Sequence, residues 1–144
     1  MLKNKVAILV KKASLEFDKL SNPIFARYNL TGSQYRVLKY LYITESRTAR
    51  VVDLEREFSM THPTTLGLLS QLEKKGFTQR VDNPEDARGK LVALTPKAEE
   101  MEKELFQLGE EIEIKLTELL SEEEREELVI LLRKLLGISE ETRR

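Results

Sequence analysis

The chain has 144 residues, of which 40% are hydrophobic, and this predicts one compact subunit with enough apolar side chains for a core. It contains no cysteine, which excludes disulfides, cysteine nucleophiles and thiolate metal sites. The net charge of −1 is unevenly distributed, since residues 1–60 hold 11 Lys and Arg against 6 Asp and Glu, whereas residues 98–127 hold 3 against 13. A surface that binds nucleic acid would therefore lie in the first two thirds of the chain.

The sequence gives no sign of a membrane segment. No apolar run approaches the roughly 20 residues that cross a bilayer, and Lys11, Lys12 and Glu16 interrupt the short apolar patch near the N-terminus. We therefore expect a cytoplasmic protein without a signal peptide and without a membrane partner.

Helical periodicity marks the first third of the chain. Apolar residues at steps of three and four predict a helix over residues 2–20, and the Ser-Asn-Pro sequence at 21–23 is expected to end it. A second helix is expected to start near Ser33, followed by a polar loop at 44–49 and a short helix over 50–58.

The best-marked helix covers residues 61–75 and follows a tight turn. Thr61 is its expected N-cap, Pro63 fits the first turn, where a missing N–H costs little, and Gly76 stops the helix. The positions predicted to face the core fall at i, i+3, i+4 and i+7: Thr65, Leu68, Leu69 and Leu72.

A β-hairpin is predicted next, because short β-branched or alternating runs at 77–81 and 90–94 flank the turn-rich segment 82–89, with Arg88 at the tip. Thr95 then caps a long helix whose apolar stripe extends to Leu119, and Ser121 caps the last helix.

This order of elements predicts a mainly α fold with a small β-hairpin wing. A short helix, a tight turn, a second helix and a two-stranded ribbon form the layout of a winged helix-turn-helix. We expect a single subunit, residues 1–144, with the winged helix-turn-helix lobe at 33–97 and a helical dimerisation region from both chain ends, at 1–20 and 98–138.

Two motifs within the lobe point to a known family. The hairpin carries D-x-R-G-K-x-V-x-L-T at 86–95, and L-E-x-x-G precedes it at 72–76. Over residues 51–98 the chain closely resembles the DNA-binding lobe of the MarR family, the multiple-antibiotic-resistance type of bacterial regulators. The resemblance implies an obligate homodimer that represses nearby genes and releases DNA when a small ligand, often an aromatic acid, binds between the lobes.

The sequence departs from the family pattern at two positions. Ala98 stands where members often have glycine, and inside a helix alanine is the better residue. Gly67 stands where many members carry a long polar or basic side chain, so one contact with a base or phosphate is expected to be missing.

The predicted DNA contacts lie on the outer face of the 61–75 helix and on the wing. A helix N-terminus can sit on a phosphate, and a guanidinium at a hairpin tip can enter a minor groove. Asp86 is expected to hold Arg88 extended through an ion pair. The predicted residues are Thr61, His62, Pro63, Thr64, Leu66, Gly67, Gln71, Arg80, Asp86, Arg88 and Lys90.

Each of these contacts has a simpler alternative reading. Thr61 and Thr64 can merely cap the helix, Arg80 and Lys90 can be ordinary exposed strand residues, and Arg88 can be a solvated turn charge. The single histidine, His62, cannot build the usual nitrogen-rich metal site alone, so no metal and no cofactor is predicted.

The terminal helices predict a twofold dimer, because their single apolar stripes offer more surface than a monomer of this size conveniently buries. Such a dimer would place two recognition helices about 34 Å apart, as a palindromic operator requires. The expected dimerisation residues are Val6, Leu9, Ala13, Leu105, Leu108, Ile112, Leu128, Leu131, Leu132 and Leu135.

A small aromatic or anionic effector is a further expectation. Residues near the junction of lobe and dimerisation helices combine aromatic walls with polar groups: Phe25, Arg27, Tyr28, Tyr35 and Tyr42. They can equally be ordinary core and interface aromatics.

Two rival functions have weaker support. An enzyme is not predicted, because the chain has no G-x-S-x-G motif and no phosphate-binding glycine loop, and the lone histidine has no evident partner. A winged-helix module that binds another protein and no DNA is the alternative to a sequence-specific transcriptional repressor.

Overall fold

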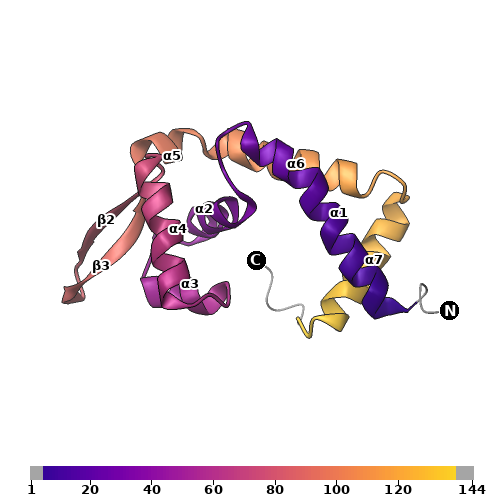
Figure 1. Cartoon of the computed structure of the whole chain (residues 1–144), viewed down its shortest axis with the longest axis horizontal. Coiled ribbons are helices and arrows are strands. Elements are labelled where there is room, and N and C mark those ends of the chain that lie inside the picture. Colours follow the sequence, from indigo (N-terminus) through magenta and orange to yellow (C-terminus); the bar gives the residue numbers. More distant parts are fainter. Residues whose placement is uncertain (1–4, 139–144) are drawn as a thin grey trace.

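The computed structural model describes residues 5–138 (Figure 1), and over this range the fold is mainly α with a small sheet, as predicted. A lobe carrying the β2–β3 hairpin stands at one end, and α1, α6 and α7 extend from it (Figure 1). The elements are α1 Val6–Ala26, α2 Gly32–Ile43, β1 Thr48–Ala49, α3 Val51–Glu57, α4 His62–Lys74, β2 Thr78–Asn83, β3 Asp86–Leu94, α5 Pro96–Glu100, α6 Glu102–Leu116 and α7 Glu122–Leu135.

The first helix is longer than predicted. It runs through Pro23 to Ala26, so the expectation that Ser-Asn-Pro ends it is wrong, and its expected first residues, 2–4, lie outside the described part of the chain. Burial of Ile24 and Phe25 offsets the hydrogen bond that proline cannot donate. The helix is terminated at Asn29, whose φ of 57° is left-handed, while the Leu30 N–H returns to the Phe25 carbonyl.

The sheet has one strand more than predicted. Thr48 and Ala49, expected to be in a loop, form β1 and pair antiparallel with Ala93 and Val92 of β3, giving the strand order β1-β3-β2. Two residues show no alternation of their own, so this strand exists only through its pairing with β3.

The caps of α2 and α4 determine where these helices start. The Thr31 side chain accepts the Gln34 N–H, and the Gln34 side chain accepts the Thr31 N–H, which closes a capping box. Thr61 caps α4 as predicted, and Gly76 follows it with a φ of 82°, a conformation that L side chains rarely adopt. Both start sites agree with the sequence.

The predicted long helix is two helices. It breaks at Met101 into α5 and α6, and α6 ends at Leu116, so Leu119 lies beyond it and is 93% exposed. Thr95 caps α5 and also donates its hydroxyl to the Gly76 carbonyl at 2.6 Å, which ties the end of β3 to the end of α4. Ser121 caps α7 with Glu124 in a capping box, as predicted.

The lobe and α6 share one hydrophobic core. Tyr35 and Tyr42 of α2 are buried and donate their hydroxyls to the carbonyls of Leu105 and Ala98. Leu105, Leu108 and Ile112 are at most 5% exposed within the subunit, so the expectation that they form the dimer interface is wrong. They face inward because α6 packs against α1, while Tyr35 and Tyr42 of α2 contact Leu105 and Phe106 of α6.

Candidate nucleic-acid interface

The outer face of α4 is exposed along its length. Its core-facing side is buried at Thr65, Leu69 and Leu72, with Leu68 partly covered, as the spacing predicted. The residues predicted to contact DNA from α4 and its cap are all solvent-accessible: Thr61, His62, Pro63, Thr64, Leu66, Gly67 and Gln71. This side of the helix is therefore free to meet a ligand.

The first turn of α4 combines capping with a free hydroxyl. The Thr61 Oγ1 accepts the Thr64 N–H at 3.3 Å and donates to the Thr64 Oγ1 at 2.9 Å. A hydroxyl has one hydrogen and two lone pairs, so Thr64 keeps its own hydrogen for an outside acceptor such as a phosphate oxygen. Capping by Thr61 and DNA contact by Thr64 are thus compatible.

His62 links the two helices of the helix-turn-helix. Its Nδ1 lies 2.9 Å from the Glu55 Oε1 of α3, while the imidazole remains 63% exposed. Its Nε2 edge is available on the outer side of α4. Sequence reasoning did not identify Glu55, because only the packing of α3 on α4 brings these two residues together.

Gly67 has open space around it, since a Cβ built there meets no atom within 4 Å. Together with Leu66, which is 39% exposed, it gives the middle of α4 a low, partly apolar profile. Close packing therefore does not require glycine at this position, and a larger side chain would fit there.

The hairpin carries Arg88 in a bulge rather than at the tip. Pro84 and Glu85 form the turn, and the pairing shifts from Asp82–Lys90 to Asn83–Asp86, which leaves residues 87–89 bulged on β3. The Asp86 Oδ1 accepts the backbone N–H of Arg88 at 3.0 Å. The expected ion pair between the two side chains is thus replaced by a contact that shapes the backbone and leaves the guanidinium exposed.

The other two basic residues of the wing are paired with carboxylates. Arg80 Nε lies 3.0 Å from the Glu73 Oε1 of α4, and Lys90 binds Asp82 across the hairpin. The hydrogen bond and charge of Lys90 lower the pKa of Asp82. The pairing of Arg80 with Glu73 could not be predicted from the sequence, because Glu73 belongs to a different element, whereas a known hairpin register places Asp82 opposite Lys90.

Comparison with known proteins identifies the family. A model described as MarR family matches residues 28–89. The multiple antibiotic resistance protein MarR of Escherichia coli is 30% identical over 129 residues, which cover 89% of this chain and 88% of that protein. This chain belongs to the MarR family of transcriptional regulators. The motifs at 72–76 and 86–95 therefore predicted the family correctly.

Two further relatives support this assignment. The HTH-type transcriptional regulator BilQ of Clostridioides difficile is 31% identical over 93 residues, 65% of this chain, and the chain spans 59% of that relative's length. A crystal structure of mutant MarR from E. coli complexed with operator DNA has a TM-score of 0.80 at 28% identity and covers 91% of this chain and 93% of that one.

An apolar face of the MarR-type subunit is left uncovered at α7 and α1. Within residues 5–138, α7 has no buried residue, although the dimerisation residues predicted on it are all hydrophobic: Leu128, Leu131, Leu132 and Leu135. Val6, Leu9 and Ala13 of α1 are also exposed. Exposed apolar helix faces of this kind usually mark an interface.

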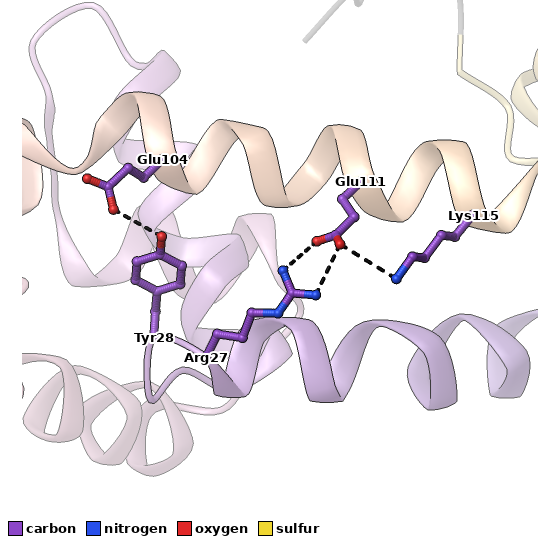
Figure 2. A network of polar contacts seen from close by, with 5 residues as sticks. All are labelled: Arg27, Tyr28, Glu104, Glu111 and Lys115. Carbon is purple, nitrogen blue, oxygen red and sulfur yellow. Dashed lines mark hydrogen bonds and ion pairs between the residues drawn. The ribbon is translucent and has the colours of Figure 1, made fainter.

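A cavity of about 570 Å³ lies between the end of α1 and α6 and is lined by Arg27, Tyr28, Glu104, Gln107, Leu108 and Glu111. Figure 2 shows Arg27 in a two-pronged ion pair with Glu111, at 2.8 and 3.0 Å, and Tyr28 donating to Glu104 at 3.0 Å. Lys115 lies 3.5 Å from the same Glu111. The cavity therefore has compensated charges rather than a free cation.

The structure separates the five residues predicted to bind an effector. Arg27 and Tyr28 line this cavity, but Phe25, Tyr35 and Tyr42 are buried in the core. The rings of Phe25 and Tyr35 stack with their centroids 4.4 Å apart, so these three residues behave as core aromatics. The hydrogen bond to Glu104 raises the pKa of Tyr28, which keeps its hydroxyl protonated as a donor.

Proposed function

We propose that this chain is a homodimeric repressor that binds palindromic double-stranded DNA through α4 and the β2–β3 wing. The observation that carries the proposal is the exposed outer face of α4 beside a wing whose Arg88 guanidinium has no partner among the described residues. In a major groove, Thr64 and Gln71 can hydrogen-bond to base edges or phosphate, and Leu66 can contact a thymine methyl.

The wing supplies the second part of the interface. The Arg88 side chain is exposed on the bulge, as a residue that enters a narrow minor groove must be. The negative potential of that groove attracts a guanidinium. Because operator palindromes mirror protein symmetry, two wings and two copies of α4 are needed.

Dimerisation follows from the uncovered face of α7 and α1. We propose that a second copy covers Leu128, Leu131, Leu132 and Leu135, with Val6, Leu9 and Ala13 beside them. Such a twofold interface is self-complementary, since each copy offers the same patch. Acting on chromosomal DNA, the dimer would work in the cytoplasm.

We assign release of DNA to a small effector in the α1–α6 cavity. The volume of this cavity falls within the roughly 300–1,000 Å³ typical of ligand sites. An anionic effector must displace Glu111 from Arg27, and Lys115 can then retain that carboxylate. Binding would therefore open the ion pair that joins α1 to α6.

The test is a titration of the dimer with a duplex recovered by random-sequence selection and with its scrambled counterpart. We expect tight binding to the first only, weakened at least tenfold by Arg88→Ala and unaffected by Lys103→Ala, which removes the same charge from exposed α6 surface. Equal and weak binding to both duplexes would refute the proposal and favour the protein-interaction module.

A further inference from the structure

The basic residues of the wing differ in whether a carboxylate neutralises them. Arg80 is paired with Glu73 and Lys90 with Asp82, whereas the Arg88 guanidinium has no ion pair or hydrogen bond within residues 5–138. A wing built only to attract phosphate would leave all three cations free. The neutralisation of two of these cations by Glu73 and Asp82 therefore requires a functional explanation.

Both ion pairs lie on the same face of the hairpin. Successive strand residues point to opposite faces, so Arg80 and Asp82 share a face of β2, and Lys90 lies directly opposite Asp82 on β3. Since Arg80 reaches Glu73 of α4 from this face, it is the side of the wing turned toward the recognition helix. The neutralised cations thus border the predicted DNA surface.

These pairs are weak enough to exchange with phosphate. Exposed ion pairs typically contribute about 0–1 kcal/mol to stability. Glu73 is 39% exposed and Asp82 is 90% exposed, so water screens both. Phosphate can therefore take either cation, but a cation already paired with a carboxylate neutralises a phosphate less well, so it displaces fewer of the counterions condensed on DNA, whose release drives binding.

We propose that Glu73 and Asp82 limit the affinity for DNA by neutralising Arg80 and Lys90 in the free protein, so that Arg88 is the uncompensated cation of the wing. This inference rests on the proposed function. Because binding to non-specific DNA is almost entirely electrostatic, the two carboxylates keep that background affinity low while the base contacts of α4 are untouched.

The salt dependence of binding tests this directly. We would measure affinity for the selected and the scrambled duplex between about 50 and 200 mM salt for wild type, Glu73→Gln and Asp82→Asn. Each freed cation should steepen the slope of log affinity against log salt by up to about 0.9, which increases the loss of affinity over this range about threefold, and each variant frees two cations in the dimer. Affinity for scrambled DNA should rise at low salt.

Glu118→Gln is the matched control, because it makes the same charge change on an exposed residue between α6 and α7, far from the wing (Figure 1). Its slope should equal that of wild type, and Arg88→Ala, which removes two cations from the dimer, should make the slope shallower by up to about 1.8. Glu73→Gln should have the larger effect of the two variants, since its pair is less exposed than the Asp82 pair.

The change in DNA affinity should have the opposite sign if the two ion pairs only hold the wing in place. Glu73→Gln and Asp82→Asn would then weaken binding with no steeper slope, and this result, or slopes equal to that of wild type, overturns the inference while sequence-specific binding by wild type stands. Wild-type binding without sequence preference would overturn the proposed function and this inference together.

Discussion

Replacing Gly109 with alanine would place a methyl group where α6 meets α2. A Cβ on Gly109 lies 2.9 Å from the Tyr35 hydroxyl oxygen, closer than real Cβ contacts. That hydroxyl donates to the Leu105 carbonyl at 2.8 Å, and its ring is buried and stacked on Phe25. Since the ring cannot swing aside, the added methyl must break this hydrogen bond or push the helices apart.

The expected cost follows from two opposing effects. Alanine in a helix interior is favoured over glycine by about 1 kcal/mol. Loss of the buried hydrogen bond costs about 1–3 kcal/mol, and overpacking costs about the same again. The net result for Gly109→Ala is a decrease in the free energy of unfolding of about 1–5 kcal/mol. Gly67→Ala gains the same helix propensity with nothing within 4 Å, so it should increase stability by about 0.5–1 kcal/mol.

Urea unfolding at one fixed protein concentration measures both variants, since the stability of a dimer depends on concentration. Tyr35→Phe in the Gly109→Ala background removes the colliding oxygen and should restore about 1–2 kcal/mol, a coupling that a double-mutant cycle isolates. If Gly109→Ala were as stable as Gly67→Ala, the close approach of α6 and α2 would be refuted.

Three further substitutions have defined outcomes. Leu131→Glu should raise the dimer dissociation constant about 10²- to 10⁴-fold, because each copy loses about 1.5–3 kcal/mol of apolar burial. Sedimentation should show monomers for this variant, whereas the control Val52→Glu on α3 should stay dimeric. Arg50 lowers the pKa of Asp53 mainly through a hydrogen bond, so the stability from this pair is present above about pH 4 and lost as pH falls through the folded pKa. Asp53→Asn should therefore flatten the acid side of the stability–pH curve, and an unchanged curve would contradict this. Pro23→Ala restores a helical N–H donor on an exposed face and should raise the unfolding free energy by about 1–2 kcal/mol, and any decrease would contradict the stated cost of the hydrogen bond missing at Pro23.

Local signals in the sequence predicted the elements that have their own caps and periodicity. Helices begin or end at these residues through contacts with residues three or four positions away, so their roles can be predicted without a structure: Thr61 and Ser121 cap helix N-termini, and Gly76 follows the end of α4. The same holds for the buried positions of α4. The exposed positions predicted to contact DNA follow from the same periodicity.

The features that could not be predicted from the sequence depend on partners that are distant along the chain. β1 forms because β3 pairs with it, and α1 continues past Pro23 because Ile24 and Phe25 find a core. Amphipathic spacing also cannot say which neighbour covers a stripe. The stripe of α6 is covered inside the subunit by α1 and α2, whereas that of α7 is exposed in the subunit, where we propose that a second copy covers it.

This difference between α6 and α7 constrains how an effector can act on DNA binding. Tyr35 of α2 is bonded to the Leu105 carbonyl of α6, and the Tyr42 ring packs on Phe106 of the same helix, so the lobe must follow any tilt of α6. The Arg27–Glu111 ion pair holds α1 to the same helix about two turns further along (Figure 2). A ligand that opens this pair would act on a helix that is already bonded to the lobe. Movement of α6 alone would then change the spacing of the two recognition helices in the proposed dimer. In the proposed mechanism, coupling between cavity and DNA therefore depends on the stiffness of α6, and a substitution at Gly109, where an added Cβ would lie 2.9 Å from the Tyr35 hydroxyl of α2, should alter it.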